Sequence, residues 1–479
     1  MPIELEMDGG RFHEMAAQAV DIVEQYYAQL SNMPVMPRTT SDDVRRLIRE
    51  PLPDKGAEFL EALATIRDVV YPLSRHNAHS RFFGYVASPG TPAAAVAELL
   101  AGGLNANVTS WRSAPAAAEM EHLVIDWLKT MIGYPSESAG LLISGGSMAN
   151  FSALAAARAA KAPGMGRDGQ GGAALRIYIS DQGHVSIPKA ASLLGIGSKN
   201  VQFIPTDASF RIDLEQLRRR LDSDVKGGHI PMCIVGNAGT VNTGAVDPLA
   251  DLADIAARYQ TWLHVDGAYG ALAASAPTAR RLFAGIDRVD SVSLDPHKWL
   301  YTSVGCGCVL YRDAGRASAA FAHEAEYTRP LGLSRDEAFA FWDLGPELSR
   351  PFRALQVWLQ IKTYGARRLS LAIDNNIACA RHFGALVEDA DDFELLAPVE
   401  LSIFCFRYRP PGFTGDLNAL NERILVALQA GGSSYVSNAR IRDAFALRGC
   451  VLNYRTKTAD MERLLEDVRA AGRTAASEL

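Results

Sequence analysis

Short runs rich in β-branched residues alternate with longer helical or loop segments in the middle of this chain, and this alternation constrains the fold most. The spacers at 186–196, 213–223 and 247–259 are long enough to carry the chain back across a sheet. Strands joined by such crossovers form parallel sheets whose two faces are covered by helices. The sequence therefore predicts an α/β fold with a mainly parallel sheet. The runs typical of strands are LRIYIS (175–180), VQFIP (201–205), MCIVGN (232–237), WLHVD (262–266), SVSLD (291–295) and GCVLYR (307–312).

The two ends of the chain have a different pattern. Residues 12–30 place apolar residues at helical spacing, and prolines at 34, 37, 51 and 53 follow them. We expect an early helix and an extended strap that lie across a partner surface. The stretch 350–388 is helical in pattern, and the runs after it predict a small α+β unit. The expected division is an N-terminal helical and extended segment over 1–90, a large domain over 91–365 and a small C-terminal domain over 366–479.

The composition argues against nucleic acid and membrane partners. A net charge of −6 and a pI near 6.0 give no basic surface for an anionic partner. No stretch has the length of uncharged apolar residues that a bilayer requires, and the N-terminus lacks the pattern of a secretory signal. The six cysteines are dispersed, which predicts free thiols in the reducing cytoplasm and no metal site.

Two charged residues at the ends of strand-like runs are candidates for catalysis or cofactor binding. Lys298 lies in SLDPHKWL (293–300), where a lysine held in a cleft can attack an aldehyde through its amine. Asp266 ends the strand in HVDGAY (264–269), where a carboxylate can pair with a pyridinium nitrogen. The plainer alternatives are a surface lysine and an aspartate that caps a helix.

Two further segments have the pattern of a ligand site. In LLISGGSMANFSALAAAR (141–158) a strand runs through Gly145, Gly146 and Ser147 into a helix, which is the construction of a phosphate cradle. His184 follows the strand at 175–180, and its ring can stack on a flat cofactor. A glycine turn and a polar loop histidine are the alternatives. Together the four segments match the phosphate, the ring face, the ring nitrogen and the aldehyde of pyridoxal 5′-phosphate (PLP).

With these residues the chain resembles the group II PLP-dependent amino-acid decarboxylases, which include aromatic-L-amino-acid, histidine, glutamate and 2,4-diaminobutyrate decarboxylases. The resemblance covers about residues 75–360 and rests on DPHKW together with HVDGAY, whose Asp266 precedes Lys298 by 32 residues. It implies the aspartate-aminotransferase fold (fold type I) and a homodimer with active sites near its interface.

The resemblance also implies roles for individual residues. Lys298 would carry PLP as a Schiff base, His184 would stack on the ring, Asp266 would pair with the ring nitrogen, and His297 would assist proton transfer. Tyr327 is the one tyrosine in the segment 324–345, where the family has a loop tyrosine that donates a proton after CO2 leaves. Further cofactor contacts would be Gly145, Gly146, Ser147, Thr240, Ala268 and Asp295, and the substrate contacts Tyr85, Ser88, Asn107 and Thr109.

Several positions depart from the family pattern. Asn107, Val108 and Thr109 stand where aromatic-substrate members carry bulky apolar residues, which argues against an aromatic substrate. Asp295 replaces an asparagine near the phosphate, and Val241 replaces a threonine. Phe339 and Phe341 lie near the position expected for the loop tyrosine.

The resulting expectation is PLP-dependent decarboxylation of an L-amino acid to an amine. Decarboxylation with oxidative deamination to an aldehyde is the nearest alternative, because the family associates it with loss of the loop tyrosine. A lyase or transaminase of the same fold fits the DPHKW context less well. A scaffold without PLP is disfavoured because the key polar residues are all present.

Overall fold

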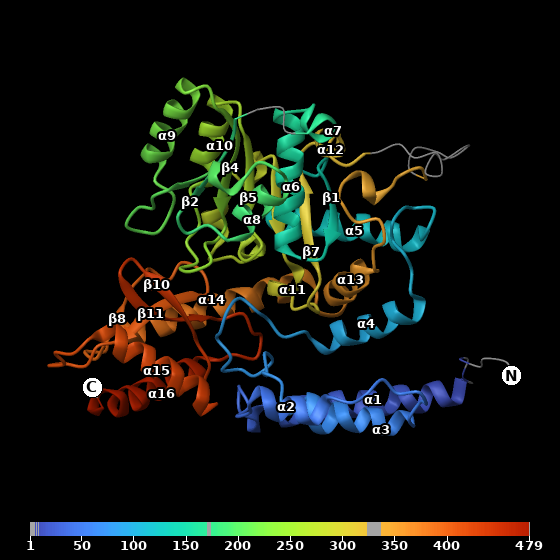
Figure 1. The fold of residues 1–479 in the computed structure, drawn as a ribbon, viewed down its shortest axis with the longest axis vertical. Helices are drawn as coiled ribbons and strands as arrows, with labels where there is room; N and C mark the ends of the chain where they lie inside the picture. The colour runs from blue at the N-terminus through green and yellow to red at the C-terminus, as the bar shows by residue number, and fades with distance from the viewer. Residues whose placement is uncertain (1–4, 6, 8, 170–173, 323–336, 479) are drawn as a thin grey trace.

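The computed structural model describes residues 5, 7, 9–169, 174–322 and 337–478. The chain forms a large upper lobe, a smaller lobe that ends in the C-terminal helix, and a helical arm at the N-terminus (Figure 1). Within the described ranges, no helix combines the length and the apolarity that crossing a bilayer requires.

A seven-stranded sheet forms the centre of the large lobe, in the order β1-β7-β6-β5-β4-β2-β3. The strands from β2 to β6 pair in parallel, whereas β7 runs antiparallel to both β6 and β1. The mainly parallel sheet predicted from the strand and crossover pattern is therefore confirmed. The strands are β1 (Ala139–Ile143), β2 (Leu175–Ser180), β3 (Val201–Ile204), β4 (Ile230–Asn237), β5 (Trp262–Asp266), β6 (Ser291–Leu294) and β7 (Gly307–Tyr311).

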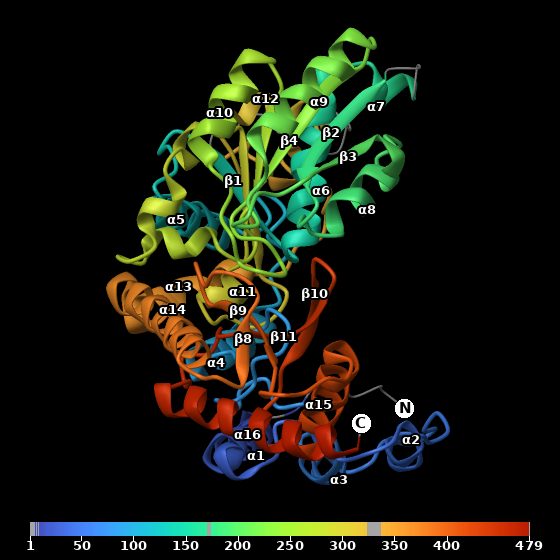
Figure 2. The same cartoon turned by 90° about the vertical axis from the view of Figure 1, so that its left-hand side faces the viewer.

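Helices cover both faces of this sheet. In Figure 2 the helices α6 (Gly146–Lys161) and α8 (Ser186–Leu193) lie on one side, with α5 (Pro115–Ile132) and α10 (Leu249–Arg258) on the other. All residues of β5, β6 and β7 are buried between these layers, the polar ones of β5 and β6 included. The other helices of this lobe are α7 (Met165–Asp168), α9 (Leu214–Lys226), α11 (Pro296–Trp299) and α12 (Ala314–Ser318).

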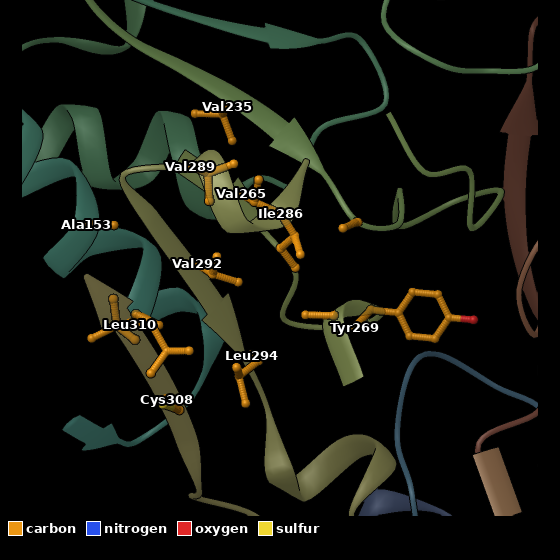
Figure 3. Packing of buried hydrophobic residues seen from close by; sticks show 14 of the residues in the cluster. Ala153, Val235, Val265, Tyr269, Ile286, Val289, Val292, Leu294, Cys308 and Leu310 are labelled. Atoms are coloured by element: carbon orange, nitrogen blue, oxygen red, sulfur yellow. The ribbon is translucent and has the colours of Figure 1, made fainter. Parts of the chain in front are cut away.

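The core on the face of the sheet away from α6 is made of aliphatic side chains at alternate strand positions, whereas the positions of β5 and β6 that face α6 are His264, Asp266, Ser291 and Ser293. Figure 3 shows Val292 and Leu294 of β6 beside Leu310 of β7. The ring of Tyr269 instead extends out of this cluster, and its hydroxyl lies 2.7 Å from Ser402 Oγ in the C-terminal part of the chain. This contact ties the large lobe to the smaller one.

The C-terminal lobe has a four-stranded antiparallel sheet, in the order β10-β11-β9-β8, with helices on it. The helical stretch expected over 350–388 is two helices, because Gly365 adopts φ +77° between them. The elements are α13 (Arg353–Tyr364), α14 (Ala366–Glu388), β8 (Phe393–Leu395), β9 (Ile403–Tyr408), α15 (Leu417–Gly431), β10 (Ser437–Ile441), β11 (Ala444–Cys450) and α16 (Thr458–Ser477).

The N-terminal arm contains more helix than the proline pattern suggests. The helix α2 (Ser41–Ile48) interrupts the expected strap, because Thr40 and Asp43 form a capping box that stabilises its first turn. The arm's helices α1 (Gly9–Gln29), α2 and α3 (Phe59–Thr65) bury none of their own residues, and α4 (Pro92–Leu104) follows them.

Candidate active site

Four chain segments that leave β1, β2, β5 and β6 meet at a cavity of about 660 Å³, together with a loop that follows β4. Parallel strands bring their carboxyl ends to one edge, which is where α/β folds place ligands. Of the predicted residues, Tyr85, Gly145, Gly146, Ser147, His184, Asp266, Ala268, Asp295, His297 and Lys298 line this cavity.

The turn from β1 into α6 is shaped to receive an anion. The helix begins at Gly146 and its sixteen residues run away from the cavity, so its free N–H groups and the positive end of its dipole face inwards. A Cβ atom at Gly146 would lie 2.5 Å from Ala268 Cβ and 3.1 Å from Asp295 Oδ2. Only glycine therefore leaves this space open.

Lys298 lies in the short helix α11, directly after β6. Its Nζ is 2.8 Å from Asp295 Oδ2, and the same oxygen is 3.5 Å from His297 Nε2. His297 Nδ1 lies 2.7 Å from the Cys306 carbonyl oxygen, so this nitrogen donates and Nε2 is left to accept. Burial lowers the pKa of His297 and outweighs the opposing effect of the Asp295 carboxylate. A neutral imidazole thus lies beside the candidate nucleophile.

Asp266 is buried at the carboxyl end of β5. Its Oδ1 accepts from Ser293 Oγ at 3.2 Å and from the Ala268 N–H at 3.3 Å, and its Oδ2 accepts from Asn150 Nδ2 at 2.9 Å. These donors hold the carboxylate in one orientation on the cavity wall. Such a carboxylate can pair with the ring nitrogen of a bound pyridinium.

His184 lies in the loop between β2 and α8. Its Nδ1 faces both the hydroxyl of Ser186, at 2.8 Å, and the Ser186 N–H, at 3.2 Å. Because a backbone N–H only donates, Nδ1 is the acceptor and Nε2 carries the proton. The ring is therefore fixed in one tautomer at the cavity wall.

Other predicted residues lie away from the cavity of this chain. Thr240 is behind the wall, where its hydroxyl lies 2.8 Å from Thr243 Oγ1 and accepts from the Ala245 N–H. Ser88 Oγ donates to the His297 carbonyl at 2.7 Å, and Asn107 Oδ1 accepts from the Arg350 N–H at 2.8 Å. Thr109 is buried but is not among the described lining residues. Tyr327 lies outside the described residues.

The cavity also has lining residues that the sequence patterns did not single out. Arg448 of β11 is buried, and its guanidinium donates to the carbonyl oxygens of Tyr85, Val241 and Asn242. Asn150 and Asn237 come from α6 and β4. Asn150 carried a local signal, since it lies one helical turn after Ser147. Arg448 carried none, because the three carbonyl groups that it binds at the cavity are more than 200 residues away.

The arrangement fits PLP. The glycine turn offers an anion cradle, Asp266 offers a buried carboxylate, and Lys298 offers an amine, all on the wall of one cavity. Asp295 Oδ1 is a buried oxygen without a hydrogen-bond partner in the described part of the chain, and it lies beside the same cradle.

Known proteins share this fold and sequence. Residues 42–409 match the model of the pyridoxal-dependent decarboxylase conserved domain. The aromatic-L-amino-acid decarboxylase of Bacillus atrophaeus is 34% identical over 472 residues, covering 98% of this chain and 97% of that protein.

Two solved plant structures are similar over nearly their whole length. TDC of Oryza sativa, solved with PLP and tryptamine, superimposes with a TM-score of 0.93 at 29% identity, covering 98% of this chain and 99% of that one. The 4-hydroxyphenylacetaldehyde synthase of Rhodiola rosea gives a TM-score of 0.88 at 29% identity, with the same coverage.

Proposed function

This chain belongs to the pyridoxal-dependent decarboxylase family, and on that premise we propose that it decarboxylates an aromatic L-amino acid in the cavity around Lys298. The chain is a PLP-dependent amino-acid decarboxylase of fold type I. The observation that carries the proposed site is the meeting of Lys298, Asp266 and the Gly146 turn on one cavity wall.

PLP, when bound, supplies an electron-accepting ring that stabilises the charge left on the substrate when CO2 departs. Lys298 is the proposed covalent attachment point, because its Nζ lies in the cavity beside a buried carboxylate. Asp266 would hold a proton at the ring nitrogen, and His184 would lie against the ring. The N–H groups at the start of α6 would bind the phosphate.

Asp295 and His297 are the proposed route for protons near Lys298. Asp295 Oδ2 lies within 2.8 Å of Lys298 Nζ and 3.5 Å of His297 Nε2, so it joins the two nitrogens. The neutral imidazole accepts the proton that the Lys298 ammonium gives up, which leaves a free amine that can react.

The aromatic substrate class is supported by the relatives and by the cavity mouth. Apolar side chains of Tyr85, Val86 and Val304 line it, and Val304 is 80% exposed. Tyr85 adopts φ +59°, a conformation that non-glycine residues adopt rarely and mostly where the surroundings impose it.

A substrate panel tests this proposal. Tryptophan, tyrosine, phenylalanine, glutamate and 2,4-diaminobutyrate are supplied to the holoenzyme while CO2, amine, aldehyde and peroxide are measured in parallel. We expect CO2 from tryptophan or tyrosine and none from the enzyme with Lys298→Ala. CO2 from glutamate or diaminobutyrate alone would overturn the aromatic assignment, and a borohydride-reduced adduct on another lysine would overturn the role of Lys298.

Aldehyde formation is the second candidate, and a specific observation favours it. Phe339 packs at 4.6 Å from the His122 ring centroid, and Phe341 is fully buried against His122 and Arg350. Neither side chain offers a hydroxyl proton.

If Tyr327 is the proton donor, Tyr327→Phe leaves CO2 release intact and shifts the product from amine to aldehyde. Unchanged amine yield would exclude that role.

We also propose that the chain works as a homodimer. The helix α4 exposes Val96, Leu99, Leu100 and Leu104, each by half or more of its surface. Such an apolar face beside an arm that buries none of its helical residues is typical of a subunit interface. This pairing would bring the loop at 107–109 towards a second active site.

Leu100→Asp tests the dimer, because a charge on that face opposes burial. We expect light scattering to report half the mass of the wild-type particle. Val426→Asp is the matched control, since Val426 is also an exposed apolar residue of a helix, 67% exposed against 54% for Leu100, and lies on α15 of the C-terminal lobe. A Leu100→Asp variant that keeps the wild-type mass would contradict the assignment of α4 to the interface.

The division into segments 1–90, 91–365 and 366–479 remains part of this proposal. The cytoplasm is the proposed compartment, supported by six free cysteines that are all buried.

A further inference from the structure

A chain of buried hydrogen bonds runs from Asp266 on the cavity wall through Asn150 to His264. Asn150 of α6 and His264 of β5 are 1% and 0% exposed. Asn150 Nδ2 lies 2.9 Å from Asp266 Oδ2 and 2.9 Å from Ser186 Oγ, and Asn150 Oδ1 lies 2.9 Å from His264 Nε2. One amide therefore contacts three polar groups, two from β5 and one from α8.

Each bond in this chain has only one possible direction. A carboxylate only accepts, so Asn150 must turn its amide nitrogen to Asp266 and its oxygen to His264. His264 Nε2 must then donate, and its Nδ1 must accept from the hydroxyl of Ser291, at 2.9 Å. Trp262 Nε1 donates to the same hydroxyl oxygen at 2.9 Å. Burial lowers the pKa of His264 to about 4, which agrees with a neutral ring.

The second branch leads to the residue over the ring face. Ser186 Oγ accepts from Asn150, so its own hydrogen is free for His184 Nδ1, at 2.8 Å. This bond keeps the proton of His184 on Nε2. Asn150 thus joins the carboxylate proposed for the ring nitrogen to the imidazole proposed for the ring face.

We propose that Asn150 is a positioning residue, with its amide orientation set by His264, that holds Asp266 and His184 together in the geometry that binds PLP. This inference rests on the roles proposed above for Asp266 and His184. Packing alone does not require an amide at this position, because an apolar side chain of similar size would fill the same space without donating a hydrogen bond to Asp266.

The isosteric substitution Asn150→Asp distinguishes a residue that orients Asp266 from a residue that only fills space. It keeps the shape and the hydrogen-bond acceptor towards His264, but it replaces the donor with a second carboxylate 2.9 Å from Asp266. We expect the PLP dissociation constant of refilled apoenzyme to rise roughly tenfold for Asn150→Ala and further for Asn150→Asp, with a change in the visible absorbance of the bound cofactor. A residue that only fills space would give the smaller effect for Asn150→Asp.

A double-mutant cycle shows through which group Asn150 acts. In an Asp266→Ala background, Asn150→Ala should add less than threefold to the dissociation constant, because the carboxylate that it orients is gone. Asn421→Ala is the control: Asn421 is an equally buried amide with hydrogen bonds to Tyr408 and Leu417 in the C-terminal lobe. It should lower unfolding stability and leave PLP affinity unchanged.

The possible outcomes distinguish this inference from the proposed function. If the effects of Asn150→Ala and Asp266→Ala on PLP affinity are fully additive, or if Asn150→Asp binds PLP as tightly as wild type, the role of Asn150 is overturned. The role of Asp266 then still stands. Wild-type affinity with Asp266→Ala overturns the role of Asp266, and the present inference falls with it.

Discussion

At the scale of single residues, Asp295 stands where the family pattern has an asparagine. Its carboxylate is buried, and Oδ2 pairs with Lys298 Nζ at 2.8 Å. Oδ2 also lies 3.1 Å from where a Cβ at Gly146 would be, next to the proposed phosphate cradle. A negative charge there stabilises the free lysine and repels the phosphate of the cofactor.

Asp295→Asn should therefore tighten PLP binding. The substitution removes the repulsion in the holoenzyme and the ion pair in the apoenzyme, and both effects favour the bound state. We expect the dissociation constant to fall by roughly tenfold, or about 1.4 kcal/mol, in a titration of apoenzyme with PLP. Asp254→Asn, which changes an exposed aspartate paired with Arg288, is the control. Weaker binding by Asp295→Asn would show that the carboxylate helps to hold the cofactor.

At the scale of elements, α6 connects the chemistry to the core. Its first residue, Gly146, forms the cradle, and Asn150 reaches Asp266 one turn later. Ala153, on the same face of the helix as Gly146 and Asn150, is buried in the core (Figure 3). Because this helix is held by the core, its N-terminus keeps a fixed distance from Lys298.

Gly146→Ala tests the cradle. The added methyl group would lie 2.5 Å from Ala268 Cβ, so either the helix start or residue 268 must move into the phosphate space. We expect at least a tenfold loss of PLP affinity, with the apoenzyme still folded by circular dichroism. Gly431→Ala is the matched control, because a Cβ at the exposed end of α15 would meet nothing within 4 Å. Equal affinities for the two variants would contradict the cradle.

At the scale of the whole molecule, the segment before Tyr85 ties the N-terminal arm to the C-terminal lobe. Asn453 Nδ2 donates to the His79 carbonyl at 2.9 Å, and Thr456 Oγ1 donates to the Ser80 carbonyl at 2.6 Å. His79 itself is 1% exposed, and burial lowers its pKa to about 4. The join between lobes therefore contains an imidazole that must stay neutral.

This histidine makes stability depend on pH. The unfolded chain binds a proton at His79 below its ordinary pKa of 6.5, whereas the folded chain does so only below about 4. Its contribution is complete above 6.5 and is lost as the pH falls towards 4, by roughly 3 kcal/mol in total. Urea unfolding at about pH 7.5 and about pH 5 should show a smaller drop for His79→Gln than for wild type. The exposed His13→Gln should behave as wild type, and an unchanged drop for His79→Gln would contradict the assignment.

The sequence by itself determined the elements of the large lobe and four residues on the cavity wall. The run WLHVD is β5 to the residue, because its apolar residues Trp262, Leu263 and Val265 suit a strand that is buried on both faces. Lys298, Asp266, Gly146 and His184 could be found because each follows a recognisable strand, and parallel strands end at a common edge.

Only the tertiary structure decided which other residues join them. Arg448 reaches the cavity from β11, and Asn150 meets His264 across 114 residues of sequence. Thr240 and Ser88 lie behind the cavity wall, where their hydroxyls form hydrogen bonds with Thr243 and with the His297 carbonyl. Periodicity and turn chemistry report on neighbours within a few residues, whereas these contacts depend on how two sheets and their helices pack. The physical reason is that packing brings distant side chains together without leaving a local pattern in either segment.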